Sequence, residues 1–479
     1  MKPVYVLFWF DVEDFINDES EAALLGLLEM LDARSVKGIF KLVGEKARRL
    51  EQNGRTDIWN RLARHEVGYH TDWHSIHPVV TEYLEPLRFR EGAAEFERRE
   101  GQGFRDVGRI TGQPVVCYGQ PGAAWAPQTY PVLRKWGIHS YIDSHNQVTF
   151  HDKPFWYGGL LNLTTLTGLM GMPLRDGALG PAKHRFDELC EAQREEPFGI
   201  ISIFYHPTEF VFEEFWDAVN FSKGNNPLRE DWVKPRMRPP GDRQRFIDMV
   251  GEFVDYTLSR PNVSYITTGD LVGFERTNSA ALSEDEVRRF AARTGDRLGY
   301  LTESESGRSL SAGELFSVYR CLLLGEEPLP ELLYGPERDL PSDEQASELL
   351  LPELIAALRE PLPRVEGFPM LPDRFRVGDV WVNPVDLACT MAAAIAAGAG
   401  EGERAKAVRT RSEESAAAVG IVEEQVIPLV RGRLTAADHA SDTAEWTKYW
   451  VIFPEKLQVP NIIEMSKLQA WTLKPAYFR

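Results

Sequence analysis

The feature that most constrains this chain is the alternation of apolar, strand-like runs with helical patterns along its first half. The first run, residues 4–10 (VYVLFWF), is aromatic and β-branched, which is typical of a strand buried on both faces. Such alternation predicts an α/β fold whose parallel strands are joined by right-handed crossovers. Further strands are expected at 38–43, 114–118, 138–142, 198–205 and 263–267, and helices at 20–33, 45–64, 85–111, 129–136 and 242–258.

The pattern changes near residue 275, where strand-like runs give way to acidic segments rich in Ala, Leu and Pro. We therefore expect a first unit over residues 1–275 and a smaller, mainly α-helical unit over residues 276–479. Two stretches of the second unit, 309–316 and 380–387, each place a Ser or Asn cap before an apolar helix. They predict two small repeats. A further helix is expected over 404–425.

Charge and composition argue against several classes of partner. A formal net charge of −18 repels phosphate backbones and anionic membranes, so we expect no nucleic-acid partner. No stretch is long and apolar enough to span a bilayer, so we expect no membrane insertion. The run at residues 4–10 ends in acidic residues without a small-residue cleavage site, so it is interpreted as a strand rather than a signal peptide. The four cysteines form no Cys-x-x-Cys pair, which fits a reducing compartment. The expected location is cytoplasmic.

Polar residues and glycines gather where the predicted strands stop. Asp11, the segment 119–122, Asp143 and His206 all come just after the carboxyl end of a predicted strand. In barrels of alternating strands and helices, catalytic residues collect at that face. These four positions are therefore expected to share one rim of the fold.

A histidine cluster supplies a second signal. His70 and His74 stand four residues apart, so on a helical turn both rings would leave the same face and could hold one metal ion. Two imidazoles leave a divalent ion short of ligands. The missing carboxylate is expected from the acidic segment 11–14, at the end of the first predicted strand.

Taken together, Phe10-Asp11, His70-Thr71-x-x-His74, the glycine–proline loop at 119–122 and the strand that ends in His206 resemble the polysaccharide deacetylases. These are carbohydrate esterases of family 4, which share the NodB homology domain. The resemblance covers roughly residues 1–275. It implies a distorted (β/α) barrel, a divalent metal ion held by one Asp and two His, and hydrolysis of an N-acetyl group on a saccharide substrate.

By this resemblance, Asp11 corresponds to the general base, His70 and His74 to metal ligands, and His206 to the catalytic acid. The family's metal carboxylate usually lies one or two residues after the base. Val12 occupies the first of these places, and the choice between Glu13 and Asp14 stays open at this point.

The third motif departs from the family, because Gln120 stands where an Arg normally orients the base. A glutamine can donate a hydrogen bond to a carboxylate but brings no charge. Lys2, Lys41 and Arg134 are basic residues that the sequence cannot place relative to Asp11. The same loop is expected to contact the oxyanion or the substrate through Gly119, Gln120, Pro121 and Gly122.

The leading hypothesis is a metal-dependent N-deacetylase of a saccharide, with zinc as the expected ion. One alternative is an allantoinase-like hydrolase of a small amide on the same fold, which can dispense with metal. Another is a carbohydrate-binding protein whose catalytic centre has decayed. Oligomerisation through the second unit is a further expectation.

Overall fold

The computed structural model of the protein describes residues 2–122, 124–144, 148, 150, 152–164, 166–222, 225–275, 280–303, 308–346, 348–398, 404–408 and 459–478. The expected helix over 404–425 therefore lies almost wholly outside the described residues, and so does the junction just after residue 275.

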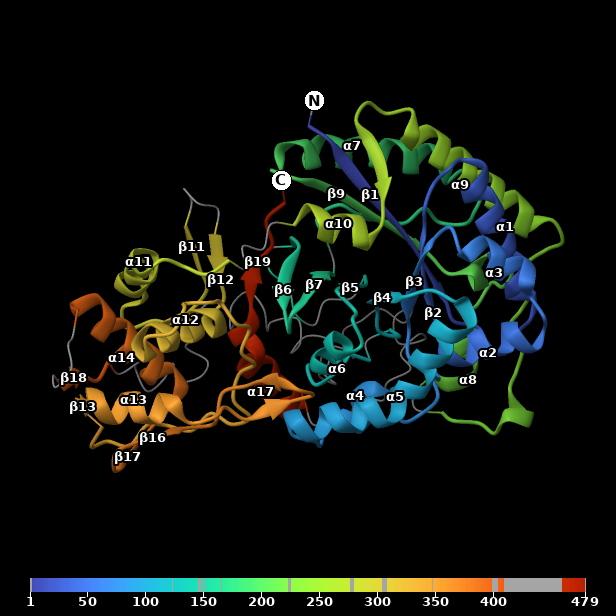
Figure 1. Ribbon diagram of the computed structural model, residues 1–479. Helices are drawn as coiled ribbons and strands as arrows, with labels where there is room; N and C mark the ends of the chain where they lie inside the picture. The colour runs from blue at the N-terminus through green and yellow to red at the C-terminus, as the bar shows by residue number, and fades with distance from the viewer. Residues whose placement is uncertain are drawn as a thin grey trace.

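One large sheet organises the first unit (Figure 1). Its strands are β1 (Val4–Val12), β2 (Ile39–Leu42), β3 (Glu66–Tyr69), β4 (Val115–Tyr118), β5 (Ser140–Ile142), β6 (Phe155–Tyr157), β7 (Leu160–Leu163), β8 (Leu169–Met170), β9 (Gly199–Tyr205), β10 (Val263–Ile266) and β19 (Lys474–Pro475). Their order is β19-β6-β7-β5-β4-β3-β2-β1-β9-β8, with β10 also paired to β1. All pairs are parallel except those that β6 makes with β7 and β19. The curled, open sheet confirms the predicted α/β fold with a distorted barrel.

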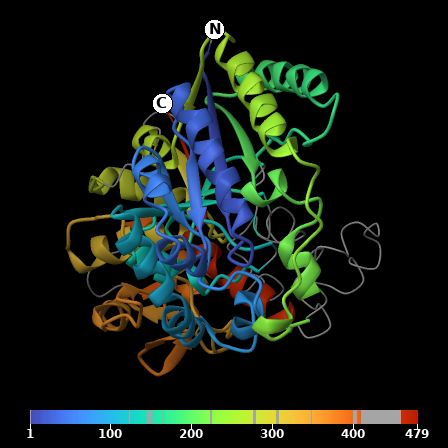
Figure 2. The same cartoon turned by 90° about the vertical axis from the view of Figure 1, so that its right-hand side faces the viewer.

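Helices cover the outer face of this sheet, and α1 and α9 lie in front of the strands in Figure 2. The helices of the first unit are α1 (Glu19–Ala33), α2 (Gly44–Gln52), α3 (Thr56–Leu62), α4 (Val80–Leu84), α5 (Phe89–Thr111), α6 (Thr129–Lys135), α7 (Leu179–Glu195), α8 (Trp216–Phe221), α9 (Asp242–Leu258) and α10 (Thr268–Phe274). Helix α10 packs on the opposite face, where Leu271 joins the apolar cluster of Leu7 and Trp9. The single helix expected over 45–64 is divided into α2 and α3, because Gly54 adopts a left-handed φ of 64° between them.

Helix α1 illustrates how the sequence fixes this packing. Leu24, Leu27, Leu28 and Leu31 recur at intervals of three and four residues, so they share one face of the helix. All four side chains are fully buried. Burying a leucine contributes about 1.5–3 kcal/mol, so this face alone holds the helix firmly on the sheet.

Helices predominate over strands in the described residues after 280, which lie to one side of the sheet (Figure 1). These helices are α11 (Glu284–Thr294), α12 (Ala312–Leu324), α13 (Leu351–Arg359), α14 (Pro384–Ala397) and α17 (Val459–Leu468). Short antiparallel pairs, which the sequence did not predict, join β11 (Leu301–Glu303) to β12 (Arg308–Leu310), β13 (Glu348–Leu350) to β18 (Arg404–Lys406), β14 (Arg364–Val365) to β15 (Phe368–Pro369), and β16 (Phe375–Val377) to β17 (Val380–Val382). Among the described helices, none combines the length and hydropathy needed to cross a bilayer.

The two stretches expected to be repeats have the same local order. In each, a hairpin leads into a capped helix: Ser311 caps α12 after β12, and Asn383 caps α14 after β17. Both cap side chains accept a hydrogen bond from the backbone N–H three residues on. Their relation as repeats stays a prediction.

The two units meet through the C-terminal segment. Strand β19 pairs with β6 at the edge of the large sheet. Lys474 Nζ lies 2.7 Å from a carboxylate oxygen of Glu314 on α12, and both side chains are buried. The Tyr157 hydroxyl donates to the Ser466 carbonyl. The boundary near residue 275 stays a prediction. The β19–β6 pair and the Tyr157–Ser466 bond cross it, whereas the Lys474–Glu314 pair lies within the second unit and holds β19 against α12.

Candidate active site

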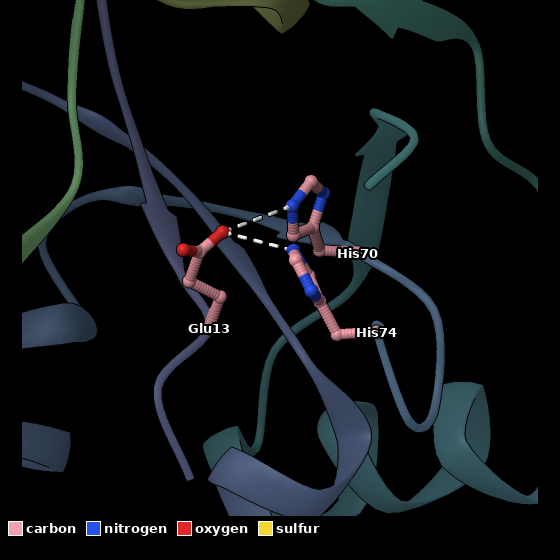
Figure 3. A group of neighbouring side chains, drawn as sticks. All are labelled: Glu13, His70 and His74. Atoms are coloured by element: carbon pink, nitrogen blue, oxygen red, sulfur yellow. Dashed lines mark ion pairs between the residues drawn. The ribbon is translucent and has the colours of Figure 1, made fainter. Parts of the chain in front are cut away.

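Glu13, His70 and His74 form one buried cluster at the carboxyl ends of β1 and β3 (Figure 3). Glu13 Oε2 lies 2.9 Å from His74 Nε2 and 3.7 Å from His70 Nε2. Although burial opposes ionisation, the imidazoles of His74, His206 and His70 hold the pKa of Glu13 well below its usual range. One carboxylate and two imidazoles within 4.8 Å of one another could hold a divalent metal ion.

The two rings converge because of a loop, not because of the expected helical turn. Strand β3 ends at Tyr69, and Thr71 and His74 then adopt positive φ angles of 65° and 49°. The Thr71 hydroxyl accepts from the backbone N–H of His74 at 3.1 Å, which closes the turn. The backbone N–H of His70 donates to the Leu42 carbonyl at 2.9 Å, which ties the loop to β2. The expectation of one helical face is therefore wrong, although the rings meet.

Hydrogen bonds on the far side of the imidazoles fit a metal site. His70 Nδ1 lies 2.8 Å from the Gly119 carbonyl, which can only accept, so Nδ1 carries the proton and Nε2 faces Glu13 with its lone pair. His74 Nε2 makes no hydrogen bond of ordinary geometry among the described residues, although Glu13 Oε2 is close. A buried nitrogen lone pair opposite a carboxylate is an arrangement that a cation would satisfy.

The structure resolves the choice of carboxylate geometrically. Asp14 points away from the cluster: its Oδ1 accepts from the Asn17 N–H at 2.9 Å and its Oδ2 from the Thr208 hydroxyl at 3.1 Å. Burial raises the pKa of Asp14 to about 6. Asp14 thus orders the turn before α1. Its inclusion among the candidate ligands is corrected, because its carboxylate is already occupied by these donors.

Asp11 has a partner that the sequence could not place. On the neighbouring strand β2, Lys41 lies in register with Asp11, and Lys41 Nζ is 2.9 Å from Asp11 Oδ1. The same ammonium lies 3.6 Å from Asp143 Oδ2 and donates to the Ile142 carbonyl at 3.0 Å. Burial opposes the charge, but Asp11 and Asp143 outweigh it and raise the pKa of Lys41. Asp11 therefore has the cationic neighbour that Gln120 does not provide.

Two glycines make room for this lysine. A Cβ on Gly68 would lie 2.9 Å from Lys41 Cγ, and a Cβ on Gly119 would lie 2.1 Å from Lys41 Nζ. Gly68 pairs with Lys41 in the sheet, and Gly119 follows β4. The glycine of the 119–122 loop is thus required by the path of the lysine side chain.

The rest of that loop is engaged with its neighbours. Gln120 Nε2 donates to the Gly122 carbonyl at 3.0 Å, and Gln120 Oε1 accepts from the Tyr141 hydroxyl at 2.6 Å. The Pro121 carbonyl accepts from the Ala124 N–H. These bonds hold the loop beside the cluster, where the Gly119 carbonyl also orients His70.

His206 completes the group at the end of β9. Its Nε2 lies 3.5 Å from Asp11 Oδ2, and its Nδ1 lies 3.0 Å from Glu209 Oε1. Burial disfavours the imidazolium, but Glu209, Glu13 and Asp11 outweigh burial and raise the pKa of His206 to about 10. Sequence reasoning missed Glu209. Its signal is the spacing of three residues across the 3₁₀ turn η1 (Pro207–Phe210).

A cavity of about 380 Å³ adjoins His206. Its walls come from the segment after β8, the end of β9 and residues 208–215. Two wall residues also contact His206: Glu209 through its carboxylate and Phe215 through its ring, whose centroid is 5.0 Å from that of the imidazole. A ligand in this cavity would lie against Glu209 and Phe215, the two wall residues that contact His206.

Neither a scan against protein-family models nor a search of curated proteins finds a match. Solved structures are similar over little more than half of the chain. A probable polysaccharide deacetylase from Pseudomonas aeruginosa is 14% identical, covering 56% of this chain and 90% of its own, with a TM-score of 0.36. The Puue allantoinase is 14% identical, covering 56% of this chain and 89% of its own, with a TM-score of 0.36. A CE4 family pseudoenzyme from Bacillus anthracis is 16% identical, covering 55% of this chain and 64% of its own, with a TM-score of 0.29. Values this low do not by themselves define an activity.

Proposed function

We propose that this protein is a metal-dependent hydrolase that removes an N-acetyl group from a saccharide. The observation that carries the proposal is the convergence of three kinds of group at one rim of the sheet. These are the Glu13–His70–His74 cluster, the Asp11 carboxylate held by Lys41, and the His206 imidazole. Two histidines and a glutamate form a donor set of catalytic zinc sites, so zinc is the ion that we propose.

The side chains can share the work of amide hydrolysis. A bound divalent ion would polarise the amide carbonyl and acidify a water molecule. Asp11, between Lys41 and His206, would accept the proton of that water. His206 would donate a proton to the departing amine, which leaves poorly as an anion. Backbone N–H groups of the 119–122 loop would stabilise the oxyanion.

Metal analysis tests the first part of this proposal. Purified wild-type protein should carry about one divalent ion per chain, and His70→Ala and His74→Ala should lose it. His184→Ala is the matched control, because His184 is an exposed histidine of α7 that pairs with Glu188. Undiminished metal content in both ligand variants would contradict the assignment.

Kinetics test the second part. His206→Ala should lower the turnover of an N-acetyl saccharide by about 10²–10⁴-fold, the usual contribution of a positioned acid. An activated aryl acetate, whose leaving group needs no proton, should lose much less activity. Equal losses on both substrates would show that His206 holds the site together rather than donating a proton.

Hydrolysis of small cyclic amides and binding of saccharide without turnover separate the alternatives. An allantoinase-like enzyme would hydrolyse small cyclic amides and leave acetylated sugars intact, whereas a decayed protein would bind saccharide without turnover. A cytoplasmic enzyme that acts on a soluble or lipid-linked precursor sugar remains part of the proposal, as does oligomerisation through residues 276–479.

A further inference from the structure

Helix α8 belongs to the long segment after β9 and lies directly against the candidate metal ligands. We propose that Trp216 and Asp217, the first two residues of α8, are positioning residues that set the affinity of the Glu13–His70–His74 site for its ion. The inference rests on the metal site of the proposed function. It adds that residues outside the strand ends determine whether the site is loaded.

Trp216 fixes the orientation of Glu13. The indole Nε1–H donates to Glu13 Oε1 at 3.1 Å, which leaves Oε2 as the oxygen that faces both histidines. The indole itself is immobilised: it is fully buried, and its ring centroid lies 4.8 Å from that of Phe15. A glutamate held by one oxygen loses less conformational freedom when the other oxygen binds an ion.

Asp217 fixes the tautomer of His74 through Ser75. His74 Nδ1 lies 2.5 Å from Ser75 Oγ, and Ser75 Oγ donates to Asp217 Oδ2 at 3.1 Å. Because the aspartate accepts the only hydroxyl proton, the serine oxygen is left to accept from His74 Nδ1–H. The lone pair of His74 is thereby placed on Nε2, the atom that faces Glu13.

The three candidate ligands are therefore oriented by two different parts of the chain. His70 is oriented by the Gly119 carbonyl at the end of a sheet strand, whereas Glu13 and His74 are oriented from α8. Helix α8 is itself tied down, since His77 Nε2 lies 3.2 Å from the Phe221 carbonyl. The helix and the histidine loop thus form one connected unit around the site.

A thermodynamic consequence follows. Partners that orient metal ligands typically contribute 10–100-fold in affinity. By linkage, an ion that binds more tightly when α8 is in place must stabilise α8 in that place by the same factor. Metal affinity and amide exchange within Trp216–Phe221 should therefore change together.

The test uses the full chain and zinc alone, titrated against a chromogenic chelator. Trp216→Phe keeps the aromatic packing but removes the N–H donor. Asp217→Asn keeps the shape of the side chain but can place an amide N–H, which donates, where the carboxylate oxygen accepts from the Ser75 hydroxyl. Each variant should bind zinc about 10–100-fold more weakly. Trp59→Phe on α3 and Asp231→Asn, an exposed residue of the same segment, are the matched controls and should bind like wild type.

Hydrogen exchange gives the second readout. Zinc should slow exchange of the α8 amides in wild type and in both controls, and less so in the two variants. If Trp216→Phe does not fold, as judged by circular dichroism, Asp217→Asn decides alone. Zinc affinities within about twofold of wild type, in a protein whose His70→Ala variant no longer binds, would overturn this inference only. A wild-type protein that binds no zinc would overturn the proposed metal site as well.

Discussion

Replacing Lys41 with Met would remove the buried ammonium that lies between the carboxylates of Asp11 and Asp143 in the candidate site. The side chain of Lys41 has no exposed surface, and its Nζ lies 2.9 Å from Asp11 and 3.6 Å from Asp143. Met retains most of the apolar stem, which packs beside Gly68, so the substitution mainly deletes the charge. Asp11 and Asp143 would then share a buried edge of the sheet without a cation.

The magnitude can be worked from these distances. At an effective dielectric constant of about 20, Coulomb's law gives an attraction of roughly 6 kcal/mol for the 2.9 Å pair. Part of that attraction offsets the cost of burying the ammonium. Removing one partner of a buried ion pair therefore costs about 3–5 kcal/mol, and we expect Lys41→Met to lower the free energy of unfolding by that amount.

Urea unfolding at pH 7, followed by circular dichroism, measures this loss. Lys37→Met, an exposed lysine just before β2, is the matched control and should stay within about 0.5 kcal/mol of wild type. Adding Asp11→Asn to Lys41→Met should restore about half of the loss, because one uncompensated charge disappears. A loss below about 1 kcal/mol, or a double variant no more stable than Lys41→Met, would refute the reasoning.

Two further predictions concern the same region. Gly119→Ala places a Cβ 2.1 Å from Lys41 Nζ and 2.5 Å from the Ile142 carbonyl, so urea unfolding should show a loss of about 1–3 kcal/mol, whereas Gly171→Ala, with open space around its Cβ, should be neutral. Burial raises the pKa of Glu100 from 4.5 to about 7, so the folded state holds its proton longer than the unfolded state. The contribution of Glu100 to stability should then fall as pH rises from about 4.5 to 7. Glu100→Gln should flatten that slope, and an unchanged slope would contradict the assignment.

Local patterns in the sequence were sufficient to predict six strands of the large sheet, β1, β2, β4, β5, β9 and β10, but not β3, β6, β7, β8 or β19. They also singled out the residues on which the proposed site rests. The run before Asp11, the spacing of His70 and His74, and the strand that ends at His206 are all short-range signals. Their meeting follows from one rule, that the carboxyl ends of parallel strands share an edge. The choice between Glu13 and Asp14 could not be made in the same way, because adjacent acidic residues differ only in the direction of their side chains.

The sequence could not predict the residues that contact the site residues from distant parts of the chain, and the reason is different. Lys41 meets Asp143, and Trp216 meets Glu13, across large separations in the sequence, and neither pair belongs to a spacing pattern. The helical-turn expectation for His70 and His74 failed because two non-glycine residues adopt positive φ angles, which their identities do not signal. The hairpins of the second unit are only two or three residues per strand, too short for a periodic signal.

The pairing of β19 with β6 has a consequence for the newly synthesised chain. Gly158, just after β6, bonds to Thr472, which follows it by 314 positions. At a synthesis rate of about 5–20 residues per second, roughly 15–60 s pass between the emergence of one edge strand and the other. Throughout that interval β6 presents an unpaired edge on which another chain could add a strand. The ribosome thus imposes a waiting time on this sheet that refolding of the finished chain in a test tube would not reproduce.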